Sequence, residues 1–282
     1  MPGIADARAR EALAMQIVAS LRREEYFRRI QQRGPIQAAR ADPHSASFEA
    51  ELGVVHFLQT GQRDEAAWLI FLMVYLAKPE GSGWTRLRDI YGIRGQGRWT
   101  WNIVSADPQA FEHWLAENWQ TIRGKFGNHR KYASIRAGAN GWMGPAVTRY
   151  IQWVNEAGGH DALFGRLIHE AGNDPHSIFD RFYKVLPVKG FGRLGRFDWV
   201  AMLARYGFMP AEAGSAYLKG ATGPVAGIKL LFANNPEAKL SLADMQQRLD
   251  ALDGYLGVGM EVLEDAICNW QKTQFEFKHF KG

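Results

Sequence analysis

From Leu186 to Asp198 the chain reads Leu-Pro-Val-Lys-Gly-Phe-Gly-Arg-Leu-Gly-Arg-Phe-Asp, and this stretch indicates the architecture around it. A run of apolar residues at helical spacing precedes it over residues 177–185, and Pro187 ends that run. Three glycines then permit a tight turn, and a second helical run continues to about residue 206. The sequence therefore predicts two helices joined by a glycine-rich hairpin.

Positive charge surrounds the start of the second predicted helix. A helix start presents unpaired backbone N–H groups and suits an anion, and glycine lets the anion approach closely. Arginines in a first helical turn oppose the helix dipole unless an anion lies nearby. We therefore expect phosphate, with DNA as its leading source, to bind here to Lys189, Arg193, Arg196 and the backbone of Gly190 and Gly192.

Composition sets outer bounds on the function. The chain has 282 residues and a net charge of +5, which is compatible with a nucleic-acid or polyphosphate partner. Its single cysteine, Cys268, excludes an internal disulfide. The most apolar run, residues 66–77, is too short to cross a bilayer, and the N-terminus does not resemble a signal peptide. We expect a cytoplasmic protein without a membrane partner.

Helical periodicity dominates the rest of the chain, and no convincing alternating strand pattern is present. Asp107-Pro108 and Asp174-Pro175 each combine an N-cap with proline at the first helical position, so a helix should follow each pair. The predicted class is all-α, with about ten helices in one catalytic domain, 1–282, whose two packed lobes span about 1–140 and 145–282. Further helices are expected over 4–32, 48–60, 64–78, 84–91, 145–155, 160–171, 224–232 and 242–271.

Four glycine-punctuated polar segments interrupt the helices: residues 92–101, 126–132, 186–198 and 217–224. Each sets Arg or Lys beside glycine, which suits oxyanions. Surface loops with solvated charges are the alternative for any one segment. The chemistry that all four share favours anion binding, and the last segment adds Lys219 to the expected phosphate ligands.

Three side chains are candidates for acid–base chemistry. Glu264 borders the apolar face of the last predicted helix, where burial would raise its pKa and suit a general base, although an ordinary surface ion pair is an equal alternative. Asp198 suits a first helical turn for structural reasons and is a second candidate. His129 lies beside Arg130, where a phosphate-binding or capping role is the more common one. No metal-ligand spacing or Walker A motif is present.

Taken together, these segments resemble the alpha-glutamyl/putrescinyl thymine pyrophosphorylase family, also described as amino acid:DNA transferases, and most closely its third clade. The resemblance extends from about residue 60 to the C-terminus and is weakest in the N-terminal helix. The residues that carry it are 68–71, 88–92, 95–101, 126–132, 191–198, 214–224, 257–260 and 263–272.

The resemblance implies a role in thymine hypermodification of DNA in phages and related bacterial elements. A separate kinase converts 5-hydroxymethyluracil in double-stranded DNA to a pyrophosphate ester, and the transferase then displaces pyrophosphate with the amine of an amino acid or polyamine. The family also resembles helix-hairpin-helix DNA glycosylases distantly. Where such glycosylases carry a nucleophilic lysine this chain has Gly192 or Leu194, and the next aspartate after Asp198 is Asp244, although Glu212 falls near the expected place. Base excision is therefore disfavoured.

Under this hypothesis the target base leaves the stack and a base deprotonates the incoming amine. Alternative functions are a helix-hairpin-helix DNA glycosylase, a non-catalytic DNA-binding protein, or an enzyme acting on a free nucleotide. A magnesium ion on the pyrophosphate has no visible dedicated ligand set. The expected roles are base catalysis by Glu264, Asp198 or His129, pyrophosphate binding by Lys189, Arg193, Arg196 and Lys219, carboxylate binding by Arg98 or Arg130, and base stacking by Trp99, Trp101 or Tyr132.

Overall fold

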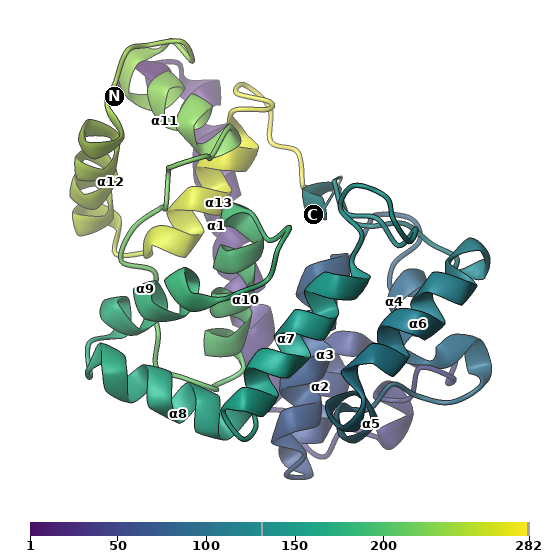
Figure 1. The fold of residues 1–282 in the computed structure, drawn as a ribbon. Helices are drawn as coiled ribbons and strands as arrows, with labels where there is room; N and C mark the ends of the chain where they lie inside the picture. The colour runs from purple at the N-terminus through teal and green to yellow at the C-terminus, as the bar shows by residue number, and fades with distance from the viewer. Residues whose placement is uncertain (131, 281–282) are drawn as a thin grey trace.

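The computed structural model describes residues 1–130 and 132–280, and over these residues it contains thirteen α-helices and no β-strand. The all-α prediction is confirmed (Figure 1). None of the described helices is long and apolar enough to span a membrane. The helices are α1 (Ala7–Gln31), α2 (Ala50–Gln59), α3 (Arg63–Leu76), α4 (Thr85–Tyr91), α5 (Trp101–Ala106), α6 (Pro108–Asn118), α7 (Gly144–Glu156), α8 (His160–Ala171), α9 (Pro175–Val185), α10 (Arg193–Arg205), α11 (Gly223–Ala233), α12 (Leu242–Leu256) and α13 (Met260–Trp270).

The core is organised around α3, which is buried along its whole length from Glu65 to Leu76. Its apolar residues occur on every side of the helix, so it can be stable only with neighbours all around it. It packs against α2, α8 and α10. The ring of Phe71 stacks on Tyr150 of α7 with centroids 3.7 Å apart, which joins the two halves of the chain through one aromatic core.

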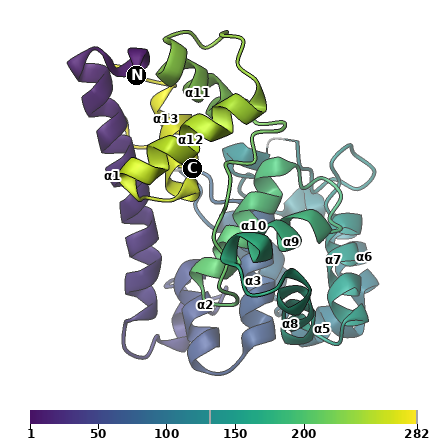
Figure 2. The ribbon, with the colours of Figure 1, turned by 90° about the vertical axis from the view of Figure 1, so that its left-hand side faces the viewer.

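The N-terminal helix lies beside the last helix. Figure 2 shows α1 running along one edge of the molecule, from the C-terminal helices at the top to α2 at the bottom. The indole N–H of Trp270 on α13 donates to the carbonyl of Ala9 at 3.0 Å. α1 therefore packs with the C-terminal helices, and the division into two lobes near residue 140 stays a prediction.

The predicted helical hairpin is present as α9, a turn and α10. Asp174 caps α9 by accepting from the backbone N–H of Ser177 at 2.8 Å, and Pro175 takes the first helical position. Gly190 has φ +93° in the turn, a conformation that favours glycine. These bounds establish two helices joined by a turn, and the finer likeness to helix-hairpin-helix glycosylases stays a prediction.

The single helix predicted over 242–271 is wrong. It is divided into α12 and α13 at Gly257 and Gly259, whose φ angles are +61° and +85°. The side chain of Asp253 accepts from the backbone N–H groups of Val258 and Gly259, which fixes the break. The apolar pattern continues through the break, so periodicity alone concealed it. The short helix α5 was not predicted.

Candidate active site

A pocket of about 930 Å³ lies where α1, α10 and α13 meet the segments that precede α7 and α11. This volume is in the range of substrate-binding pockets. Its walls come from positions throughout the chain. Its lining includes Arg23, Glu24, Phe27, His129, Gly192, Arg193, Phe197, Asp198, Arg205, Thr222, Gly223, Pro224, Glu261, Glu264, Asp265, Asn269, Lys272, His279 and Phe280.

The pocket brings together all three residues predicted for acid–base chemistry. His129 comes from a 3₁₀ turn (Asn128–Arg130), Asp198 from α10 and Glu264 from α13. They are also electrostatic neighbours, because the charge of Asp198 influences the pKa of both His129 and Glu264. The structure thus places the three candidate bases around one pocket, and the role of each stays a prediction.

Glu264 is buried and forms an ion pair with Arg193. The Nη1 atom of Arg193 lies 2.6 Å from Oε1 of Glu264, and the two side chains are only 10% and 8% exposed. Burial raises the pKa of Glu264 above its ordinary value, while the guanidinium of Arg193 acts in the opposite direction. The sequence left a buried base and a surface ion pair open, and the structure gives a carboxylate that is both buried and paired.

Arg193 has protein acceptors on all three side-chain nitrogens. Besides the pair with Glu264, Nε donates to the carbonyl of Tyr217 at 3.0 Å and Nη2 to that of Ala216 at 2.7 Å. These contacts compensate its charge within the protein, and the phosphate contact of Arg193 stays a prediction. Its side chain ties the start of α10 to α13 and to the segment before α11.

Arg196 also binds a protein group where an anion was expected. Its Nη1 atom donates to the carbonyl of Tyr183 at 2.9 Å, in the last turn of α9. Cations are favourable at that end of a helix, so Arg196 stabilises the C-terminus of α9 across the hairpin. Carbonyl groups and Glu264 already compensate the charges of the two first-turn arginines, and the predicted phosphate contact of Arg196 stays a prediction.

Only one of the remaining predicted phosphate ligands lines the pocket. Gly192 lines the pocket. Gly190, Lys189 and Lys219 are exposed and are not among the lining residues. Lys189 and Lys219 stay predicted contacts for the DNA backbone.

The two arginines predicted to bind an amino-acid carboxylate are held elsewhere. Arg130 is 6% exposed and lies behind Asp198, with Nη2 at 3.0 Å from its carboxylate and Nε donating to the carbonyl of Val74. Arg98 pairs with Asp42 at 3.1 Å and is not among the pocket-lining residues. Arg130 therefore contacts Asp198 and Arg98 contacts Asp42, and binding of an amino-acid carboxylate by either arginine stays a prediction.

Two of the three predicted stacking residues belong to the core. Trp99 and Trp101 are 8% and 6% exposed, and the ring of Trp101 packs on His160 with centroids 4.3 Å apart. Neither ring is among the pocket-lining residues, and base stacking by Trp99 or Trp101 stays a prediction. Tyr132 is 82% exposed and stays a predicted contact, although it is not among the lining residues.

His129 stands exposed at the pocket wall. Desolvation by the neighbouring atoms lowers its pKa, the carboxylate of Asp198 opposes this shift, and Arg130 adds to it. A histidine with a lowered pKa is neutral at neutral pH, and its free ring nitrogen can accept a proton.

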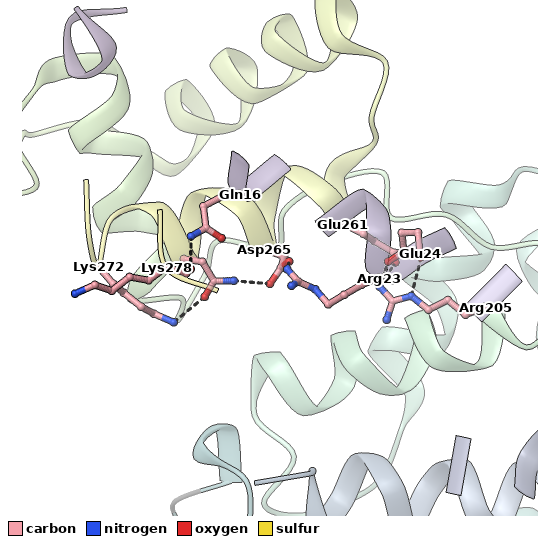
Figure 3. Close-up of polar contacts among 9 residues, drawn as sticks. Gln16, Arg23, Glu24, Arg205, Glu261, Asp265, Lys272 and Lys278 are labelled. Atoms are coloured by element: carbon pink, nitrogen blue, oxygen red, sulfur yellow. Dashed lines mark hydrogen bonds and ion pairs between the residues drawn. The ribbon is translucent and has the colours of Figure 1, made fainter. Parts of the chain in front are cut away.

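A polar wall that the sequence did not predict lines the side of the pocket between α1 and α13 (Figure 3). Lys272 donates to Asn269, which donates to Asp265, and Asp265 pairs with Arg23 of α1. Arg205 of α10 forms ion pairs with both Glu24 and Glu261, at 2.5 and 3.1 Å. No local signal could have indicated how α1 joins this wall, because its contacts from Arg23 to Asp265 and from Glu24 to Arg205 each link residues more than 170 positions apart.

Two helix starts border the same pocket. Gly192 and Arg193 begin α10, and Thr222 and Gly223 begin α11. Neither helix has a side-chain cap, so their first-turn N–H groups carry uncompensated positive dipole ends. In the described part of the chain, no three His, Cys, Asp or Glu residues are grouped as metal ligands. Magnesium carried by a pyrophosphate stays a prediction.

A buried carboxylate, a histidine with a lowered pKa and two helix starts without side-chain caps lie around one pocket of this all-α protein, and this arrangement suits acid–base chemistry beside an anionic group. The chain matches the family model of alpha-glutamyl/putrescinyl thymine pyrophosphorylase clade 3 over residues 8–282, and it belongs to this family. The family name indicates an enzyme of thymine hypermodification, with DNA bearing modified thymine as the implied substrate. The match includes α1, which the sequence resemblance covered least. Searches of curated proteins and of solved structures gave no match.

Proposed function

We propose that this protein displaces pyrophosphate from 5-(pyrophosphoryloxymethyl)uracil in double-stranded DNA with the amine of an amino acid or a polyamine. The observation that carries the proposal is the single pocket in which Glu264, Asp198 and His129 lie beside two uncapped helix starts. Membership of the thymine pyrophosphorylase family supports the choice of substrate.

The reaction is a substitution at the methylene carbon on C5 of the uracil. The amine nitrogen forms a C–N bond, the C–O bond to the pyrophosphate breaks, and pyrophosphate leaves with the bonding electrons. One proton must leave the nitrogen. No electron donor or acceptor is needed, and a separate kinase supplies the pyrophosphate ester because this chain has no Walker A motif.

The helix starts of α10 and α11 are proposed to hold the departing pyrophosphate. Negative charge grows on that group in the transition state, and fixed N–H dipoles stabilise it without reorganising.

Glu264 is proposed as the general base. A free α-amine has a pKa of about 8 and is mostly protonated at neutral pH, so a base must assist the attack. Arg193 holds Oε1 of Glu264, and no hydrogen bond to Oε2 is found among the described residues. The raised pKa of Glu264 makes its carboxylate a stronger base than an exposed glutamate. Asp198 and the neutral His129 are the second and third candidates.

The target nucleotide is proposed to leave the duplex and enter the pocket, since the methylene group must meet both amine and base. Lys189 and Lys219 would then contact the DNA backbone outside the pocket, where both are exposed.

The proposal is tested by incubating the protein with a duplex carrying 5-(pyrophosphoryloxymethyl)uracil and a panel of amino acids and polyamines. Digestion to nucleosides and mass spectrometry should detect an aminated thymine analogue. Free base or an abasic site would indicate a glycosylase instead. An unchanged duplex with every amine would leave only a DNA-binding role, and turnover of the mononucleotide but not the duplex would identify a nucleotide enzyme.

A further inference from the structure

Stacking of the flipped base needs an aromatic ring with a free face, and the pocket wall offers three phenylalanines: Phe27, Phe197 and Phe280. Phe197 is buried and packs against Phe179, with centroids 5.3 Å apart. Phe27 packs edge-on against Tyr206 at 5.5 Å. Among the described residues Phe280 has no aromatic partner, so it is the phenylalanine of this wall whose ring is not already part of the core.

Phe280 lies on a strap formed by residues 273–280, which follows α13 and contains no helix. The strap is fastened at two points: Gln274 donates to the carbonyl of Gly3 at 2.9 Å, and Gln16 donates to the carbonyl of Lys278 at 2.8 Å (Figure 3 shows the second contact). These bonds come from the N-terminal segment and α1, and they hold Phe280 against the pocket that contains Glu264.

The ring of Phe280 is already oriented by a cation. The Nζ atom of Lys272 lies 4.5 Å from the ring centroid, a favourable cation–π distance. A cation on one face leaves the opposite face for another flat group. The Nζ atom of Lys272 also donates to Oδ1 of Asn269 at 2.8 Å, so Lys272 connects α13 to the ring of Phe280.

We propose that Phe280 stacks on the target pyrimidine and positions it in the pocket, in place of the core tryptophans Trp99 and Trp101. Lys272 supports the ring from the side opposite the base. This inference rests on the proposed function, because it assumes that a pyrimidine enters the pocket. It makes the C-terminal strap part of the substrate-binding wall.

The test measures DNA binding by wild type and by Phe280→Ala on two duplexes that differ at one nucleotide. One duplex carries 5-hydroxymethyluracil, which lacks the leaving group and does not react, and the other carries a tetrahydrofuran abasic site at that position. Loss of a stacking ring should weaken binding to the first duplex by roughly tenfold to a hundredfold. Binding to the abasic duplex should stay unchanged, because it has no base to stack.

Phe277→Ala is the matched control, since Phe277 belongs to the same strap but lines the adjoining groove beside α1 and is not among the pocket-lining residues. It should leave binding to both duplexes unchanged, and Phe280→Trp should restore binding to the first. Equal loss by Phe280→Ala on both duplexes, or loss on neither, would overturn the inference. The proposed function is tested separately by amine transfer in the wild type, which can occur even if Phe280 does not stack on the target base.

Discussion

At the scale of single residues, the ion pair between Glu264 and Arg193 determines how the pocket can work. Two nearly buried opposite charges 2.6 Å apart are costly to separate, since the remaining charge would be left without compensation. Arg193 therefore holds the base in place, while burial keeps the pKa of Glu264 raised. Glu264 thus joins α13 to α10 through Arg193 and, by our proposal, also acts as the catalytic base.

Glu264→Gln should change the pH dependence of stability. A carboxyl whose pKa is raised in the folded state stabilises the fold fully below its unfolded pKa and loses that contribution as pH rises through its folded pKa. The unfolding free energy of wild type relative to the variant should thus fall as pH increases from about 4 toward 8. Urea unfolding of both proteins across this range measures the difference in unfolding free energy. Burial also raises the pKa of Glu65 and Glu261, but both proteins contain these residues, so their titration cancels in the difference. A difference that is flat or rises with pH would contradict the assigned shift.

The identity of the candidate bases could be predicted from residue type and local position, but their partners could not. Glu264 was found because it borders an apolar helical face. The acceptors of Arg193 are carbonyls 23 and 24 positions later in the chain, and those of Arg196 lie in the preceding helix. A cation beside a helix start has the same sequence signature whether its partner is phosphate or protein. Trp99 and Trp101 lie near glycines in the sequence, and this local pattern does not distinguish a tryptophan in a binding loop from one in the core.

At the scale of elements, the break between α12 and α13 sets the direction of the helix that carries Glu264. Gly257 ends α12 in the left-handed region, and Asp253 accepts from the two N–H groups that follow. The break allows α13 to lie along α1 and present Glu264 to the pocket.

Gly257→Ala should destabilise the protein by about 1–2 kcal/mol, because an L-residue is strained at φ +61°. Gly254→Ala is the matched control three positions earlier, inside α12, where an added Cβ meets no atom within 4 Å. It should stabilise the protein by roughly 0.5–1 kcal/mol through helix propensity. Denaturant unfolding of each variant measures the change in unfolding free energy. Equal effects of the two variants would refute the role given to the break.

Elements with local start and stop signals were predicted well. The Asp-Pro pairs before α6 and α9 form the expected caps, with Asp107 accepting from two backbone N–H groups. The break at Gly257 was missed because glycine is tolerated within helices and the apolar spacing continues on both sides of it. Its conformation depends on the packing of α13, which is a tertiary effect.

At the scale of the whole molecule, the pocket exists because the two ends of the chain meet. α1 and α13 lie side by side, and the strap at 273–280 bonds to Gly3 and Gln16. Contacts across more than 240 positions leave no local trace in the sequence, which explains why Arg23 and Glu24 were not predicted as pocket residues.

DNA binding by the whole molecule should depend strongly on salt. If Lys189 and Lys219 each neutralise one phosphate, replacing both by Ala should reduce the slope of log K against log salt by about 2. Lys239→Ala, an exposed lysine between α11 and α12, should leave the slope unchanged. Titration at several salt concentrations provides the slopes, and identical slopes for wild type and the double variant would exclude these lysines as phosphate contacts.

The most direct test of the central claim is one time course that follows pyrophosphate release and aminated nucleoside together, on duplex DNA carrying 5-(pyrophosphoryloxymethyl)uracil. For the wild type we predict equal amounts of both products at every time. For Glu264→Gln we predict both to fall by roughly a hundredfold or more while DNA binding is retained, with exposed Glu11→Gln unchanged as the control. Pyrophosphate release without an adduct, release of free base, or full activity of Glu264→Gln would contradict the account.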